Sequence, residues 1–164
     1  MVEISHFVRN DRRNPRIDQL DYNENMIAHT SSGYQERPHT ADWALDVWAS
    51  DLVSLLRTAA QGMYALIGAR PESNPDRKDY KIEFVVQDQE TLLVSFLSEL
   101  IYFTGRDNIA FDEFDLTLDG SKLIAIVSGL PIESQAKEIK AVTFHNLSIR
   151  QTERGLETTI VFDV

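Results

Sequence analysis

Cysteine is absent from this chain of 164 residues, and long apolar runs are missing as well. Without a thiol the chain cannot build a disulfide framework, a thiolate metal site or a cysteine nucleophile. The same absence fits a reducing compartment. No apolar run approaches the roughly 18 to 20 residues of a membrane span, and residues 1–19 carry charges where a signal peptide needs its apolar stretch. These absences predict a cytoplasmic protein.

Positive charge is also scarce, since 16 lysine and arginine residues face 26 acidic ones and the formal net charge is -10. The sequence shows no arginine- or lysine-rich stripe interleaved with aromatic residues, and an acidic surface does not attract phosphate backbones. We therefore expect no direct nucleic-acid binding. A basic protein partner or a cation fits this charge better.

Several catalytic motifs are missing too. The chain has no Gly-rich loop followed by Lys and Ser/Thr, no paired-glycine dinucleotide motif and no Gly-x-Ser-x-Gly motif. Its histidines lack the i, i+4 spacing of a helical zinc site. These histidines are His6, His29, His39 and His145. Nucleotide cradles and helical zinc sites are thus excluded as explanations of function.

What is present suits one compact domain, with 43% hydrophobic residues arranged in periodic blocks. Residues 1–32 differ from the rest, because arginines there mix with asparagine and proline and the apolar residues show no period. We predict a mobile N-terminal extension over residues 1–32 and a folded domain over residues 33–164. A partner-binding arm is the alternative interpretation of the extension.

The periodic blocks predict two helices and several strands. Alternation over residues 43–49 predicts a strand, and apolar residues at helical spacing predict a helix over residues 52–67, which Gly68 ends. A second helix is predicted from Asp88 to Phe103, with Gly105 ending it. The segment 69–78 reads as a loop by composition.

Further strands are predicted over residues 80–86, 111–118, 122–127, 142–150 and 158–164. Asp119 and Gly120 accept the positive φ angles of a type I′ turn and so predict a hairpin. Two helices against six or seven strands, many in hairpin order, predict an α+β fold in which two helices pack on one face of a mainly antiparallel sheet.

Two local patterns suggest a metal ion. An acidic cluster invites a calcium interpretation, but its spacing does not match a calcium-binding helix-loop-helix, and we interpret it as a solvated strand. The cluster consists of Asp107, Asp112, Glu113, Asp115 and Asp119.

The second pattern is Glu138-Ile139-Lys140, which would place an acid and a lysine on one side of a strand, as in metal-dependent nucleases. A nuclease would also need a preceding acid and a basic groove, and no such groove is predicted. This pattern defines an alternative function, a metal-dependent nuclease or phosphodiesterase that uses Asp42, Glu138, Lys140 and Asp163.

A set of three segments is more specific than either pattern. His39-Thr40-Ala41-Asp42 leads into a strand, residues 138–147 read EIKAVTFHNL, and residues 161–164 read VFDV. Together, in this order and at these distances, they resemble the archease family. The resemblance covers about residues 34–164, and residues 92–102 are similar to the family's second helix.

The resemblance implies an α+β protein that is not itself an enzyme. Archeases assist RtcB-type RNA ligases, which join RNA ends through a guanylylated histidine in tRNA splicing and RNA repair. They promote the guanylylation step and allow the ligase to turn over repeatedly. The family also carries a carboxylate cluster that binds a divalent cation, so a cation such as calcium is implied here.

The family's functional positions fall on Asp42, Lys140 and Asp163, with His39 inside the first motif. The family usually has an acid before that histidine, and Pro38 stands there in this chain. One oxygen ligand is therefore missing. Water, the chain terminus at Val164 or another acid fills the gap, or the site binds metal weakly.

The residues themselves are compatible with this implication. Asp42 begins one predicted strand and Asp163 lies near the end of another, and an acid among apolar strand residues needs a cation or a lysine beside it. Lys140 is the candidate counter-charge. An ordinary salt bridge between Lys140 and one of the two acids is the structural alternative.

Overall fold

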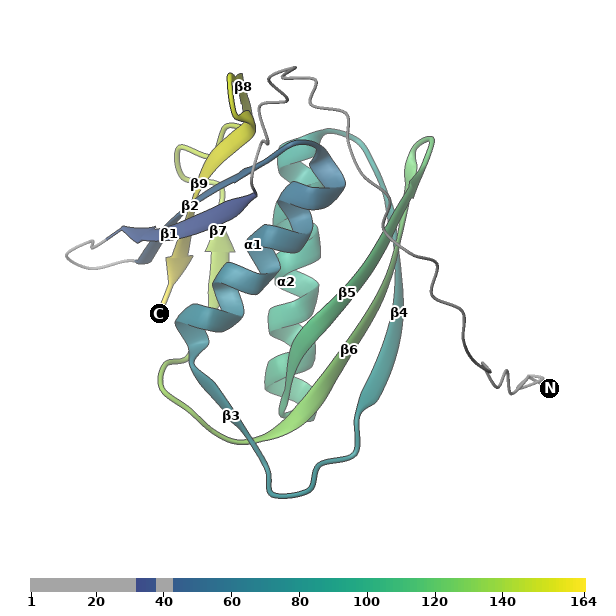
Figure 1. The fold of residues 1–164 in the computed structure, drawn as a ribbon, viewed down its shortest axis with the longest axis vertical. Helices are drawn as coiled ribbons and strands as arrows, with labels where there is room; N and C mark the ends of the chain where they lie inside the picture. The colour runs from purple at the N-terminus through teal and green to yellow at the C-terminus, as the bar shows by residue number, and fades with distance from the viewer. Residues whose placement is uncertain (1–31, 38–42) are drawn as a thin grey trace, which may run out of the picture.

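The computed structural model describes residues 32–37 and 43–164 of the chain. Over these residues a pair of α-helices lies between two antiparallel sheets (Figure 1). The α+β class predicted from the sequence is confirmed, whereas the strands divide between two sheets instead of forming one. No helix among the described residues combines the length and apolar character needed to cross a membrane.

The first sheet has five strands in the order β1-β2-β9-β7, with β8 also paired to β9. Its strands are β1 (Gly33–Arg37), β2 (Trp43–Ala49), β7 (Ala141–Thr143), β8 (Arg150–Thr152) and β9 (Gly155–Asp163). Because β2 follows one side of β9 over nearly its whole length, β7 and β8 share the other side. Strand β9 is therefore the centre of this sheet.

The second sheet has four strands built around a long central one. They are β3 (Ala69–Pro71), β4 (Lys78–Val85), β5 (Ile109–Asp119) and β6 (Lys122–Gln135). Strand β5 follows one side of β6, and β4 and β3 pair in turn with its other side. The hairpin of β5 and β6 rises at the edge of the molecule in Figure 1.

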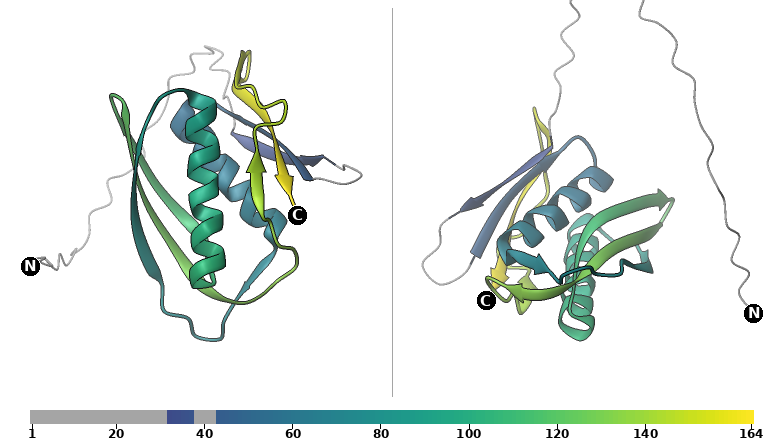
Figure 2. Two further views of the ribbon diagram at one scale, coloured as in Figure 1. Left: turned by 180° about the vertical axis from the view of Figure 1, so that it is seen from behind. Right: turned by 60° about the horizontal axis from the view of Figure 1, so that its bottom comes forward.

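The two helices fill the space between the sheets. Helix α1 (Leu52–Ile67) contacts β1 and β2 on one side and β5 on the other, and only Gln61 and Ala65 in it are exposed. Helix α2 (Gln89–Asp107) contacts β7 of the first sheet and β4 and β5 of the second. Figure 2 shows α1 enclosed in this way. With so little surface exposed, the polar side chains of α1 need partners, and Arg57 Nε donates to Phe114 O while Thr58 Oγ1 donates to Ser54 O.

Both helices begin at an aspartate that caps free backbone N–H groups. The Asp51 carboxylate accepts a hydrogen bond from Ser54 N at 2.8 Å, and that of Asp88 accepts one from Thr91 N at 2.7 Å. The bonds from Thr91 lower the pKa of the Asp88 carboxyl. Helix α1 ends at Gly68 in the left-handed conformation, as the sequence predicts.

Helix α2 continues past its predicted end. Gly105 continues the helix, and Asn108 adopts the left-handed conformation at its C-terminus with φ 55°. Asparagine is the residue that most readily replaces glycine at such a position. The hairpin turn is shifted by one residue, because Asp119 pairs with Lys122 and the loop is Gly120-Ser121. Of those two loop residues only Gly120 has positive φ, which is typical of a type II′ turn.

Three strand predictions need correction. The predicted loop 69–78 contains the short strand β3, and β1 was not predicted. The predicted strand over residues 142–150 is broken into β7 and β8 by a turn at Asn146, which has φ 53°. The predicted extension over residues 1–32 lies outside the described residues except for Ser32, so it stays a prediction.

Two glycines give a direct test of the packing. Gly129 lies on β6 where a Cβ atom would press on the Ala110 backbone and come within 2.7 Å of Ile109 Cγ2, whereas a Cβ at Gly105 meets nothing within 4 Å. We predict that Gly129→Ala lowers the free energy of unfolding by about 1 to 3 kcal/mol, because β5 must move away. Gly105→Ala should raise it by about 0.5 to 1 kcal/mol through helix propensity. Urea unfolding measures both, and equal effects of the two variants would contradict the packing described for β5 and β6.

Candidate functional site

The ends of three strands meet at one end of the five-stranded sheet. Strand β2 begins at Trp43 opposite Phe162, and β7 begins at Ala141 opposite Asp163. Strand β9 itself ends at Asp163, next to the C-terminus marked in Figure 1. We call this the strand-end site: Lys140, Asp163 and Val164.

Lys140 is anchored to β9 by two hydrogen bonds. Its backbone N–H donates to Asp163 O at 2.9 Å, and its ammonium Nζ donates to Val164 O at 3.0 Å. The backbone bond extends the β7–β9 ladder by one residue, which fixes where the lysine side chain starts. Lys140 is exposed, so its ammonium keeps access to solvent while it holds this position.

Asp163 points to the outer face of the sheet, away from the helices. It alternates along β9 with Phe162, which is fully buried in the core. Asp163 is exposed, so its charge needs no counter-ion to offset burial. Among the described residues no ion pair joins its carboxylate to Lys140, because the lysine Nζ donates to Val164 O instead.

The other predicted site residues lie outside the described residues. These are Asp42 and His39, together with Pro38 in the position of the family acid. Asp42 directly precedes Trp43, the residue that pairs with Phe162 next to Asp163. The motifs predict that Asp42 and Asp163 lie on neighbouring strands within reach of one cation, with Lys140 nearby. Strands β2 and β9 are neighbours in the sheet, and the placement of Asp42 itself stays a prediction.

A second lysine reaches the same end of the sheet. Lys137 Nζ lies 3.0 Å from the centre of the Trp43 ring, a cation–π contact between the segment before β7 and the start of β2. Sequence reasoning missed Lys137, because no local pattern connects a lysine at that position to a tryptophan so far away along the chain. Only the pairing of both strands with β9 brings the two side chains together.

Glu138 is placed differently from the prediction. Residues 137–140 form no strand, so Glu138 and Lys140 do not project from one side of a strand as predicted. Both border an open hollow of about 610 Å³ between this segment and the end of α2, where Tyr102 and Arg106 also lie. Ile139, between them, is buried in the core.

Three of the five acids in the cluster of residues 107–119, namely Asp107, Asp112 and Glu113, are engaged in ordinary ion pairs with arginines. Arg106 binds the Asp107 carboxylate, and with a hydrogen bond from the Tyr80 hydroxyl it lowers the pKa of Asp107 to about 2. Arg77 binds Asp112 at 2.5 Å. Among residues 32–37 and 43–164, no group of three or more His, Asp or Glu side chains has the geometry to hold a metal ion.

The model of the archease protein family matches residues 34–164, so the chain belongs to the archease family. It is 29% identical to protein archease of Methanopyrus kandleri over 139 residues, which is 80% of this chain and 99% of that protein. Protein archease of Methanosarcina barkeri is also 29% identical, over 80% of this chain and 95% of the relative.

Two solved structures share the fold. The solution structure of a Methanobacterium thermoautotrophicum protein superposes with a TM-score of 0.64 at 22% identity, covering 80% of this chain and 99% of that one. The crystal structure of a Thermotoga maritima archease, described as a possible chaperone, superposes with a TM-score of 0.61, also at 22% identity, and covers 79% of this chain and 98% of that one. The resemblance to the family that the sequence motifs indicated is thus confirmed.

Lys140 and Ile139 are adjacent in the sequence, but Lys140 belongs to the strand-end site and Ile139 to the core, so the two residues allow site and core to be tested separately. Lys140 is exposed and its side chain makes one hydrogen bond, so we predict that Lys140→Ala lowers the free energy of unfolding by less than about 1 kcal/mol. Ile139 is only 6% exposed, and Ile139→Ala should cost about 2 to 5 kcal/mol. Thermal and urea unfolding measure both values. A large loss of stability in Lys140→Ala would mean that the lysine serves the fold itself.

Proposed function

We propose that this protein promotes guanylylation and multiple turnover of an RtcB-type RNA ligase in tRNA splicing and RNA repair. Membership of the archease family supports the proposal. The structural observation that carries it is the exposed strand-end site, where Lys140 is tied to Asp163 and Val164 by backbone and side-chain hydrogen bonds. This role places the protein in the cytoplasm with the ligase, as an accessory factor and not an enzyme.

A divalent cation belongs to the proposal. The oxygen atoms of Asp163 and Val164 are hard donors of the kind that calcium prefers, and Asp42 is the third proposed ligand. Among the described residues the Val164 oxygen accepts a hydrogen bond from Lys140 alone, and an oxygen of this kind has a second lone pair with which to bind an ion. These donors fit a divalent cation in kind, while calcium takes six to eight oxygen ligands, so water supplies the remainder. When bound, the ion would supply positive charge beside an acidic edge.

The chain's own residues set the shape of this edge. The bond from Lys140 N to Asp163 O holds β7 against the last residue of β9, so the ammonium and the carboxylate stay at one end of the sheet. Both side chains are exposed and open to a partner surface. A mixed cationic and anionic edge of this kind recognises a partner by complementary charge. His39, in the first motif, is proposed to contribute to the same surface.

The matched test compares the proposed residues with Glu138. We predict that Asp42→Ala, Lys140→Ala and Asp163→Ala each abolish stimulation of guanylylation of the ligase from the same organism, because each removes a charge from the edge. Glu138→Ala should retain stimulation, since among the described residues Glu138, unlike Lys140, forms no hydrogen bond with Asp163 or Val164. Rates of ligase guanylylation with and without each variant provide the measurement.

The same variants separate this function from the nuclease alternative. A nuclease that uses Glu138 would degrade RNA with added magnesium or manganese and would lose that activity in Glu138→Ala. Full stimulation of the ligase by all three alanine variants would refute the assignment of the site. A wild-type protein that fails to stimulate its own ligase would refute the accessory role.

Calcium affinity tests whether Pro38, in place of the family acid, removes an oxygen ligand from the site. If the family acid at this position is an oxygen ligand, Pro38→Asp should bind calcium more tightly than the wild type, because it restores one carboxylate. Calorimetric titration of both proteins gives the two affinities, with Asp163→Asn as a variant that should lose binding. Equal affinity of all three proteins would exclude a cation from the strand-end site.

A further inference from the structure

The outer face of the five-stranded sheet carries a groove of about 330 Å³ that lies apart from the strand-end site. On β2, Asp46 and Trp48 point to this face because they alternate with the buried residues Leu45, Val47 and Ala49. The groove is lined almost entirely by polar and charged side chains. Three of these are arginines, in a chain whose formal net charge is -10.

Strand register arranges the lining residues in two rows. Trp48 on β2 and Arg150 on β8 both lie opposite Glu157, on its two sides. In the next row, Asp46 lies opposite Thr159. The position opposite Trp48 on β1 is Gly33. A Cβ atom there would come within 2.5 Å of the tryptophan ring, so the position requires glycine. The Trp48 ring therefore packs over Gly33 of β1 and forms part of the groove lining.

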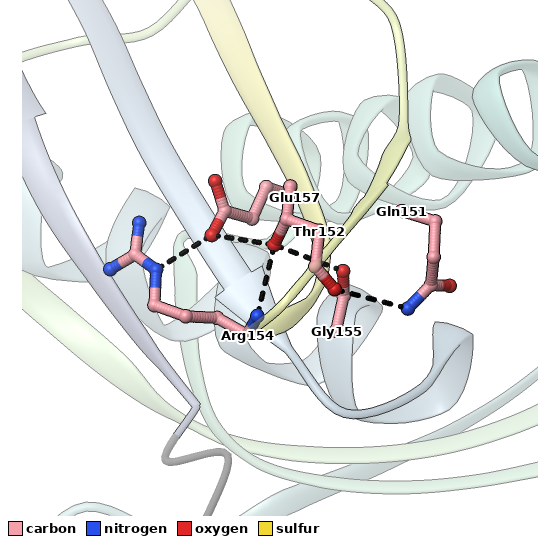
Figure 3. A network of polar contacts seen from close by, with 5 residues as sticks. All are labelled: Gln151, Thr152, Arg154, Gly155 and Glu157. Atoms are coloured by element: carbon pink, nitrogen blue, oxygen red, sulfur yellow. Dashed lines mark hydrogen bonds and ion pairs between the residues drawn. The ribbon is translucent and has the colours of Figure 1, made fainter.

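Arg154 is held in place through only part of its guanidinium. Its Nε donates to Glu157 Oε1 at 2.6 Å, and its charge lies 4.7 Å from the centre of the Trp48 ring. Thr152 Oγ1 donates to the same Glu157 oxygen at 2.9 Å. Figure 3 shows the two terminal nitrogens of Arg154 directed away from Glu157. The hydrogen bonds from Arg154 and Thr152 lower the pKa of the Glu157 carboxyl, which favours the ionised form that binds Arg154.

Arg37 is held in the same manner on the other side of the groove. Its Nε donates to Asp46 Oδ2 at 2.7 Å, while Thr159 Oγ1 donates to Asp46 Oδ1 at 2.6 Å. Among the described residues, the terminal nitrogens of Arg37 and Arg154 donate no hydrogen bond. Both guanidiniums are thus oriented by an acid and still have donors available for a ligand.

Arg150 adds a third cation, which has no acidic partner among the residues that the structure describes. Three arginines and two carboxylates leave the groove with one excess positive charge. Guanidinium groups match the oxygen geometry of phosphate through paired N–H donors, and a pre-oriented guanidinium loses less side-chain entropy on binding. Arg150 and Arg154 both flank Glu157, whereas Arg37 lies on β1, across β2 and β9 from Arg150, and is held there by Asp46.

We propose that this groove binds phosphate esters, with Arg150 and Arg154 contacting one phosphate group and Arg37 contacting a second group of a longer ligand. A free mononucleotide occupies the first position only. A short single strand of RNA spans both positions, which departs from the expectation of no nucleic-acid binding because the net charge of the chain does not reveal that three arginines gather in one groove. The proposal does not rest on the ligase partner, and none of the three arginines belongs to the strand-end site.

The test is a titration of the full chain followed by amide and arginine side-chain chemical shifts in NMR spectra. The probes are inorganic phosphate, adenosine 5′-monophosphate and a single-stranded pentauridylate. We expect saturable shifts at β8 and at the start of β9 with all three probes, and shifts at Arg37 with pentauridylate alone. If the mononucleotide binds as tightly as pentauridylate, the ligand is a free nucleotide; tighter binding of pentauridylate identifies an RNA strand.

The variants and their control settle the role of the arginines. Arg150→Ala and Arg154→Ala should each weaken phosphate binding about tenfold, the usual loss of one charge-assisted hydrogen bond. Arg37→Ala should weaken only pentauridylate. Arg70→Ala, an exposed arginine on β3 of the other sheet, should change nothing. Absence of saturable shifts, an equal loss in Arg70→Ala, or equally tight binding of a glutamate-rich peptide would each overturn the proposal.

Discussion

Pairing on both sides of β9 is the constraint on which the rest of this structure depends. Strand β2 covers one side of β9 from Leu156 to Phe162, and β7 and β8 share the other side. The inner face of β9 buries Ile160 and Phe162 against the helices, so its register cannot slip by one residue without moving these side chains to solvent. That fixed register aligns the ends of β2, β7 and β9 and so determines which polar residues share the strand-end site.

The fold class followed from the sequence because hydrophobic periodicity reports burial directly. Residues 43–49 alternate and form β2, and the stripe of residues 52–67 forms α1 with the predicted glycine end. The division into two sheets did not follow, because periodicity records that a face is buried and not which element buries it. Helix α1 is covered on nearly all sides, and only the arrangement of both sheets around it explains that burial.

The motifs predicted that the strand ends carrying Asp42 and Asp163 converge near Lys140, but the contacts that hold Lys140 in place were not predicted. Lys140 and Asp163 are far apart along the chain, and no periodic signal indicates that Lys140 N donates to Asp163 O. The break at Asn146 in the strand predicted over residues 142–150 was not predicted, because the turn there depends on the positive φ of this one residue. Likewise, the cation–π contact of Lys137 with Trp43 depends on long-range pairing that spacing alone does not contain.

The strand-end site and the arginine groove share the outer face of one sheet, which gives this acidic protein two regions of concentrated charge. Along β9, Thr159 at the groove and Asp163 at the strand end are separated by about 13 Å at the rise of an extended strand. A partner that lies along this face would contact both regions at once. The core, on the opposite side of the sheet, supplies the rigid base on which both are built.

Because the chain has no cysteine of its own, an introduced pair of cysteines tests directly whether Asp42 and Asp163 lie side by side at the ends of β2 and β9. Residues opposite one another on antiparallel strands have Cα atoms about 4.5 to 5.5 Å apart, within the range that a disulfide spans. If Asp42 continues β2 opposite Asp163, the double variant Asp42→Cys, Asp163→Cys will form an intramolecular disulfide rapidly under mild oxidation. The pair Asp42→Cys, Glu153→Cys, whose second position lies in the turn between β8 and β9 at the opposite end of β9 from Asp163, will not. Failure of the first pair to close, or closure of both pairs at the same rate, would contradict the convergence of these strand ends.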